Sequence, residues 1–240
     1  MPRFFVAEVQ DGRAELRGED ALHLARSLRV RPGELITVCD AAGTDHLCRV
    51  EAVEEGRVVA VVTQSRPASS ETPFPVTLYV ALSKGDKMES VIQKGVELGA
   101  AAFVPVLTAR CVSRPDEKSA AKKLERWNKI ARAAAEQSGR GLVPPVEAVL
   151  PFAAAVGRLA AEPLPILFYE NADQPLGPAL RGIAGGVGLM TGPEGGFEPA
   201  EVELARQQGV RVCSLGPRIL RCETAPLAAL AVVAAVLEIL

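Results

Sequence analysis

The sequence predicts an α/β protein with two domains, a small β-barrel followed by a parallel sheet that carries helices on both faces. Residues 1 to about 65 contain short β-type runs separated by turns that carry glycine. A stretch rich in Pro, Ser and Thr follows at residues 66–75, as in a linker. Beyond it, apolar runs typical of strands alternate with helical stretches, which is the pattern of a parallel sheet. We therefore expect domains at residues 1–70 and 74–240.

The expected barrel is antiparallel and contains one short helix. Its candidate strands are β-type runs at residues 4–6, 35–39, 46–50 and 58–62. Asp20 is a natural helix N-cap, so a helix is expected from Asp20 to about Leu28.

The second domain has five candidate strands and two conspicuous helices. The strands lie at residues 76–82, 102–107, 164–169, 187–190 and 210–215. A helix is predicted over residues 116–138, because Leu124, Trp127 and Ala131 recur on one face. Residues 226–240 are apolar around a whole helical circumference, but a helix of about 22 Å is too short to cross a bilayer. We expect this helix to be buried, with a second copy of the chain completing its burial.

The composition is that of a soluble globular protein and excludes several classes of site. Apolar residues make up 48% and the net charge is −2, so nucleic-acid binding requires local basic patches. The five cysteines form no Cys-x-x-Cys pair, and the only histidines are His23 and His46. We expect no metal site and no disulfide framework. The absence of an apolar leader, together with the unpaired cysteines, predicts a cytoplasmic protein without a membrane partner.

Two loops that contain glycine, at residues 191–196 and 215–225, are the candidate functional centre. Each follows an apolar run that reads as a strand. Because glycine has no Cβ, the main chain can approach a flat ligand closely and turn its N–H and C=O groups towards it. Ligands of parallel sheets bind beyond the carboxyl ends of the strands, so we expect the two loops to face each other there. A plain strand-to-helix turn is the alternative for the first loop.

The second loop differs from an ordinary turn in its side chains. Arg218 and Arg221 flank an apolar pair, and Thr224 is a natural N-cap for the following helix. Arginines on a solvated loop are the alternative explanation. The phosphate-loop signature is missing, and residues 186–191 fail the dinucleotide fingerprint, which disfavours a nicotinamide oxidoreductase.

Both loops resemble the signature of a known family. They read Gly192-Pro193-Glu194-Gly195-Gly196 and Leu215-Gly216-x-Arg218-Ile219-Leu220-Arg221-x-Glu223-Thr224-Ala225. These strings are similar to those of the RsmE-type ribosomal RNA small-subunit methyltransferases, members of the SPOUT superfamily. Residues 2–5, 23–29, 84–89, 92–99 and 136–140 also resemble blocks of that family. Cys222 departs from it, because threonine is more usual at that position.

The resemblance implies a fold, a reaction and partners. The second domain would be a SPOUT-like trefoil-knotted parallel sheet that binds S-adenosyl-L-methionine in the knot, and the first would be a PUA-like β-barrel that binds RNA. The chain would act as a homodimer through its C-terminal domain. It would transfer a methyl group to N3 of one uridine in 16S rRNA, either as naked RNA or in the small ribosomal subunit. The sequence leaves open which uridine this is.

The candidate cofactor-binding residues come from the two loops and from an acidic position after a strand. They are Glu170, Thr191, Gly192, Pro193, Glu194, Gly195, Gly196, Leu215, Gly216, Ile219, Leu220, Arg221, Thr224 and Ala225. We expect the loop main chain to cradle the cofactor, while Ile219, Leu220 and Ala225 seat adenine.

The candidate catalytic residues are charged side chains, because N3 must lose a proton while negative charge develops on the uracil. Arg218, Arg221 and Arg140 can hold a phosphate or a uracil oxygen. Glu194, Glu223 and Glu170 can accept the proton or orient the arginines, and the sequence does not choose among them. The RNA-binding candidates in the first domain are Arg3, His23, Arg26, Arg29 and Arg31.

Two other functions remain as alternatives. One keeps the cofactor and methylates a ribose 2′-hydroxyl of RNA. The other is an RNA-binding ribosome assembly factor without catalysis, which the intact second loop disfavours.

Overall fold

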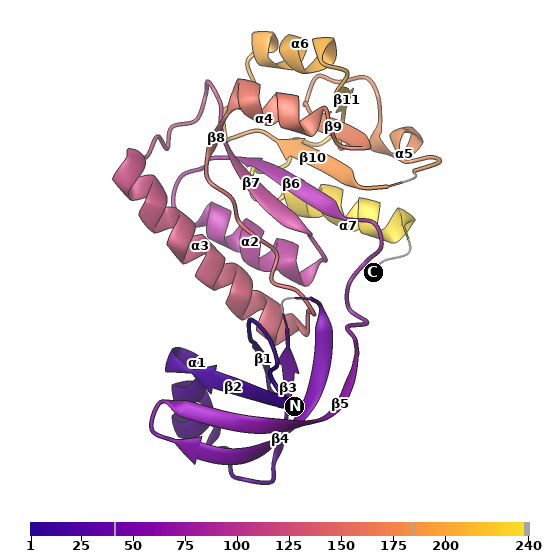
Figure 1. The fold of residues 1–240 in the computed structure, drawn as a ribbon. Coiled ribbons are helices and arrows are strands. Elements are labelled where there is room, and N and C mark those ends of the chain that lie inside the picture. Colours follow the sequence, from indigo (N-terminus) through magenta and orange to yellow (C-terminus); the bar gives the residue numbers. More distant parts are fainter. Residues whose placement is uncertain (41, 184, 238–240) are drawn as a thin grey trace. The chain divides into compact units, whose positions relative to one another are not determined.

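A computed structural model describes residues 1–40, 42–183 and 185–237 of the chain (Figure 1). The chain divides into two compact units. Unit 1 contains Met1–Glu71 and Ala135–Val143, and unit 2 contains Thr72–Ala134 and the chain from Pro144 onwards. No feature of the sequence predicted the return of Ala135–Val143 to unit 1.

Unit 1 is a curled five-stranded sheet with strand order β1-β3-β4-β5-β2. The strands are β1 (Arg3–Phe5), β2 (Arg13–Arg17), β3 (Leu35–Cys39), β4 (Thr44–Glu54) and β5 (Arg57–Pro67). β1 pairs with β3 in parallel, which differs from the expected antiparallel barrel. The chain between them contains β2 and a helical segment, a connection long enough to return in the parallel direction. Among the described residues no pairing joins β1 to β2, so the sheet is a half-barrel.

The core of unit 1 lies inside this curl. Alternate residues of the strands point inwards, including Leu16, Ile36 and Val58, and Leu24 of the helical segment packs against them. That segment is α1 (Gly18–Leu22) followed by a π-helical turn, η1 (His23–Leu28). It begins two residues before the expected N-cap Asp20 and ends at Leu28, as expected. Arg29, which follows, has a left-handed φ of 53°.

Unit 2 contains a six-stranded sheet, and all of its pairings are parallel. Its order is β11-β9-β10-β6-β7-β8. The strands are β6 (Val76–Ala81), β7 (Ala102–Leu107), β8 (Leu150–Pro151), β9 (Leu164–Phe168), β10 (Val187–Thr191) and β11 (Arg211–Cys213). The five expected strands are present with small differences at their ends, and β8 is the addition.

Helices cover both faces of this sheet (Figure 1). On one face α4 (Phe152–Leu159) and α6 (Pro199–Gln207) share a buried cluster with Tyr79 and Met190 of the sheet. On the other face lie α2 (Lys87–Glu97) and α7 (Ala225–Val236). Helix α2 packs so closely that a Cβ on Gly95 would lie 2.7 Å from the Phe103 ring. A short helix, α5 (Leu176–Ala179), follows β9. The trefoil knot stays a prediction, because strand pairing describes neighbours and not the threading of the chain.

Two long helices were predicted in this part of the chain. The longer, α3 (Glu117–Ser138), buries Trp127 and Ala131 as expected. In α7, Leu230 and Val233 are buried, whereas Val232 and Val236 are 44% and 52% exposed. Residues 238–240 of the predicted last helix lie outside the described residues. Within the described ranges no helix has the length and apolarity needed to cross a membrane.

Candidate functional site

The two glycine loops lie together, around a pocket of about 580 Å³ at the carboxyl ends of β9, β10 and β11. Residues 168–170 line it from the end of β9. The first loop supplies residues 191–197 and the second loop residues 214–222, while Lys87 and Ala225 complete the lining. The strand order makes this convergence necessary, because β9 pairs with both β10 and β11 and all three run in one direction.

The first loop is held in a fixed turn. Gly196 donates its N–H to the Pro193 carbonyl at 3.0 Å and has a φ of +67°, which suits glycine. A Cβ on Gly196 would approach Glu170 Oε1 to 3.0 Å. Arg110, from the loop after β7, donates to the Gly195 carbonyl at 2.8 Å and to Glu198 Oε1 at 2.8 Å. Glu198 and Glu201 then form a capping box at the start of α6.

The second loop exposes its apolar and cationic side chains. Gly216 has a φ of +104°, and a Cβ there would meet no atom within 4 Å. Ile219 is 87% exposed although it lines the pocket. Arg218 and Arg221 are exposed, and neither side chain has a hydrogen bond or ion pair with another described residue. The loop ends in a turn in which Thr224 and Ala225 donate to the Arg221 carbonyl, at 2.8 and 2.9 Å.

Lys87, the first residue of α2, joins the two loops. Its Nζ donates to Glu194 Oε1 of the first loop at 3.0 Å. It also lies 3.6 Å from Glu223 Oε2 and 3.6 Å from Cys222 Sγ of the second loop. The N–H of Lys84 donates to the same Glu194 oxygen at 3.0 Å. We name these side chains, Lys87, Glu194, Cys222 and Glu223, the Lys87 cluster.

The Lys87 cluster shifts the titration of its members. Burial alone would raise the pKa of Glu194, but hydrogen bonds from its own N–H, Lys87 and Lys84 outweigh burial and lower that pKa. Hydrogen bonds from its own N–H and from Cys222 lower the pKa of Glu223, and the charge of Lys87 adds to this effect. The hydrogen bond to Glu194 raises the pKa of Lys87. Both carboxylates and the ammonium group are therefore charged at neutral pH.

Thr191 carries an unpaired polar atom at the pocket wall. Its side chain is almost wholly buried, with 1% exposure, and lies where β10 ends. Its Oγ1 is the buried side-chain oxygen that has no hydrogen-bond partner among the described residues. Buried hydroxyl groups are nearly always satisfied, so this atom marks a place where a bound molecule can supply the partner.

The structure brings most of the predicted cofactor residues together. Those that line the pocket are Glu170, Thr191, Gly192, Pro193, Glu194, Gly195, Gly196, Leu215, Gly216, Ile219, Leu220, Arg221 and Ala225. Thr224 is not among the lining residues. It stands at the N-cap position of α7, but its side chain makes no capping hydrogen bond there. Of the catalytic candidates, Arg218 lines the pocket and Glu223 joins it through the Lys87 cluster.

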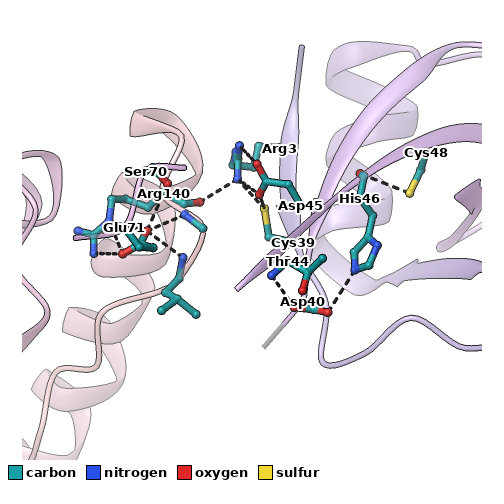
Figure 2. A network of polar contacts seen from close by, with 12 residues as sticks. Arg3, Cys39, Asp40, Thr44, Asp45, His46, Cys48, Ser70, Glu71 and Arg140 are labelled. Atoms are coloured by element: carbon teal, nitrogen blue, oxygen red, sulfur yellow. Dashed lines mark hydrogen bonds and ion pairs between the residues drawn. The ribbon is translucent and has the colours of Figure 1, made fainter. Parts of the chain in front are cut away.

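Arg140, the remaining catalytic candidate, belongs to unit 1 and is not among the pocket residues. Its side chain is 7% exposed and forms a two-point ion pair with Glu71 (Figure 2). The two N···O distances are 2.9 and 2.7 Å. The same carboxylate accepts the N–H of Gly141 at 2.8 Å. Burial would raise the pKa of Glu71, but these bonds outweigh it and lower the pKa. The pair fixes the returning segment Ala135–Val143 within unit 1.

The RNA-binding candidates fall into two groups. Arg3 donates to Asp45 Oδ1 at 2.7 Å and to the Arg140 carbonyl at 3.1 Å, with Cys39 Sγ alongside (Figure 2). Its guanidinium group is thus engaged inside unit 1. The other four, His23, Arg26, Arg29 and Arg31, are exposed on or directly after the helical segment.

Sequence reasoning missed Lys87 and Arg110 as site residues. Lys87 lies in the block at residues 84–89 that resembles the family, and it follows the carboxyl end of β6, so its place could have been suspected. Arg110 carried no sequence signal. Both contacts span more than 80 residues of chain, so neither spacing nor periodicity encodes them. Among the described residues no group of three or more His, Cys, Asp or Glu side chains is placed to hold a metal ion.

Two family models match the chain. The model described as RNA methyltransferase domain matches residues 70–234, and the model described as RNA methyltransferase PUA domain matches residues 16–63. A Bacillus subtilis protein named ribosomal RNA small subunit methyltransferase E is 38% identical over 232 residues, which cover 94% of this chain and 91% of that protein.

Solved structures give the same relationship. The ribosomal RNA small subunit methyltransferase E of Neisseria gonorrhoeae, solved with S-adenosyl methionine bound, superposes with a TM-score of 0.89 at 38% identity. That match covers 98% of this chain and 97% of the other. A methyltransferase of Legionella pneumophila, also in complex with this cofactor, has a TM-score of 0.88 at 34% identity and covers 97% and 96% of the two chains.

The ion pair of Arg140 leads to a stability prediction. Arg140→Met leaves the mostly buried Glu71 carboxylate without its cation, so we expect a loss of about 3 kcal/mol in the free energy of unfolding, measured by urea denaturation. Arg13→Met, which removes a solvent-exposed pair with Glu51, is the matched control and should leave the midpoint unchanged. Equal midpoints for the two variants would contradict the structural role of Arg140.

Proposed function

We propose a specific reaction for this chain, which belongs to the ribosomal RNA small subunit methyltransferase E family: transfer of a methyl group from S-adenosyl-L-methionine to N3 of one uridine in 16S rRNA. The chain is an S-adenosylmethionine-dependent methyltransferase of small-subunit ribosomal RNA. We place it in the cytoplasm, where this RNA is found. The position of methylation and the roles of individual residues below are our proposals.

The observation that carries the proposal is the pocket between the two loops. Its volume of about 580 Å³ lies in the range of small-ligand and cofactor sites. The unpaired Thr191 Oγ1 offers a hydrogen bond, and the glycines of both loops allow main-chain groups to approach a flat ring. Leu220 and Ala225 supply apolar surface for adenine. These features fit S-adenosylmethionine, which when bound supplies a methyl group carried on a positively charged sulfonium.

The cationic side chains of the second loop are placed to stabilise the uracil. When N3 loses its proton, negative charge spreads to the neighbouring uracil oxygens. Arg218 and Arg221 are exposed at the pocket, and neither is paired with another described residue. Their guanidinium groups can therefore donate to a uracil oxygen or to an adjacent phosphate, and we assign them this role.

The three candidate carboxylates are not equivalent as bases. Glu194 and Glu223 have lowered pKa values and are engaged in the Lys87 cluster, which makes them weak proton acceptors. Glu170 lines the pocket and makes no hydrogen bond or ion pair with other described residues. We therefore assign the N3 proton to Glu170, and we assign Glu194 and Glu223 to holding the loops.

We also propose that unit 1 binds the RNA and that Arg3 makes no contact with it. His23, Arg26, Arg29 and Arg31 are exposed on or directly after the helical segment of unit 1. The guanidinium group of Arg3 is instead committed to Asp45. Phosphate contacts require side chains that are free to reach solvent, so the exposed group is the better candidate.

The reaction is tested by incubating the protein with labelled S-adenosylmethionine and unmethylated small subunits, with naked 16S rRNA in a parallel sample. Digestion and mass analysis of the nucleosides should give 3-methyluridine. A ribose 2′-O-methyl product would replace the proposal with the alternative acceptor. Cofactor binding without any transfer would favour the assembly factor.

Replacing Thr191 should weaken cofactor binding without lowering the stability of the protein. Thr191→Val removes an unpaired buried hydroxyl, so the melting temperature should stay the same or rise. If Oγ1 bonds the cofactor, S-adenosylmethionine affinity should fall about 3- to 12-fold, which corresponds to one lost hydrogen bond. Thr108→Val is the control, because Thr108 is also buried but its Oγ1 already contacts Cys111 Sγ at 3.2 Å. The control should lower stability and leave the calorimetric affinity unchanged. Unchanged affinity in Thr191→Val would remove Thr191 from the site.

We further propose a homodimer through unit 2. Helix α7 is apolar on every side, yet Val232 and Val236 are exposed on the face turned away from the sheet. A partner subunit would cover this face. Light scattering at micromolar concentration should give the dimer mass for the native chain and the monomer mass for Val232→Glu. Val112→Glu, at a valine that is 61% exposed elsewhere, should remain dimeric. A monomeric native chain would contradict the proposal.

A further inference from the structure

We propose that Lys87 is a positioning residue for methyl transfer: its ammonium group ties the first loop to the second and thereby sets the shape of the cofactor pocket. The inference rests on the proposed function, but its contacts belong to the protein alone. Lys87 begins α2, which follows β6 and is part of neither loop. A third element therefore anchors both walls of the pocket.

The geometry shows why this contact differs from an ordinary surface pair. Lys87 Nζ lies 3.0 Å from Glu194 on one loop and 3.6 Å from Glu223 on the other. The three side chains are only about one-third exposed, at 30%, 29% and 33%. Most exposed ion pairs join two groups and contribute little. Here one cation contacts side chains of two different loops.

Removing the ammonium group would convert attraction into repulsion. Glu194 and Glu223 would then face each other as two carboxylates with no cation between them. Cys222 adds no charge, because burial, followed by the nearby carboxylates, raises the pKa of its thiol to about 11. The N–H of Lys84 would still hold Glu194 at 3.0 Å. The second loop would lose more order than the first.

The contacts of Lys87 with Glu194 and Glu223 also explain why two acidic residues lie at the pocket of an enzyme that must remove a proton. Both carboxylates have acceptor atoms directed at Lys87, so they hold loops in place and are weak bases. A direct contact between Lys87 and the carboxylate of the methionine part of the cofactor is the competing explanation, because Lys87 also lines the pocket. The two roles differ in how they respond to a ligand that lacks this carboxylate.

The experiment compares Lys87→Met, Lys87→Arg and the control Lys94→Met in the full-length protein. Lys94 lies on the same helix and forms an exposed pair with Glu97 at 3.6 Å, outside the pocket. Calorimetry measures the affinity for S-adenosylhomocysteine and for 5′-methylthioadenosine, which has no carboxylate. Hydrogen exchange of the cofactor-free protein measures the order of residues 192–196 and 215–224.

We expect Lys87→Met to weaken both ligands by the same factor, about tenfold for the loss of a charge-assisted contact. Exchange should become faster in both segments, and more so at residues 215–224. Lys87→Arg should restore most of the affinity, and Lys94→Met should match the native protein. Glu223→Gln, a smaller change, should loosen residues 215–224 alone and provides the readout if Lys87→Met does not fold.

Two results would overturn the inference. Unchanged affinity and exchange in Lys87→Met would show that the contact does not hold the loops. A loss confined to S-adenosylhomocysteine, with 5′-methylthioadenosine unaffected, would make Lys87 a direct ligand of the cofactor carboxylate. If the native protein binds neither ligand, the proposed function fails. The exchange data still test whether Lys87 holds the two loops.

Discussion

The parallel pairing of β9, β10 and β11 is the constraint on which the rest of the site depends. Because all three strands run in one direction, their carboxyl ends lie at the same side of the sheet and the segments that follow them must share that space. Two of these segments are the glycine loops, and the third brings Glu170. Contacts from α2 and from the loop after β7 then fix the loops, through Lys87 and Arg110. Strand topology therefore determines where the pocket lies, and side-chain contacts then fix the loops that line it.

The backbone of this pocket is held in conformations that only particular residues tolerate. Gly196 and Gly216 have φ values of +67° and +104°, and a side chain at either position would be strained. Thr191 keeps a buried hydroxyl without a partner. The unpaired hydroxyl costs stability in the free protein and is retained where a bound molecule supplies the partner. The place of this hydroxyl at the pocket wall is a physical argument for binding that does not depend on the family.

Much of this architecture could be predicted because it follows from local patterns. Five of the six strands of unit 2, the helix around Trp127 and the position of both loops follow from apolar periodicity and glycine placement. The parallel pairing of β1 with β3 could not be predicted, since it depends on how a distant segment returns. The same holds for Arg140, which looked like a free cation in the sequence and pairs with Glu71, 69 residues away. Ion pairs of this kind are chosen by tertiary packing, so sequence spacing carries no trace of them.

The segment Arg221-Cys222-Glu223 places a positive and a negative side chain in different surroundings within one loop. A turn closed by Thr224 and Ala225 on the Arg221 carbonyl separates these neighbours. It leaves Arg221 exposed and directs Glu223 to within 3.6 Å of Lys87. Cys222 lies between them, with its Sγ 3.3 Å from Glu223 and 3.6 Å from Lys87. A neutral thiol is a weak donor, and this one donates to the Glu223 carboxylate. The sorting of charge within this loop thus depends on backbone turns, and the residue at position 222 modulates it.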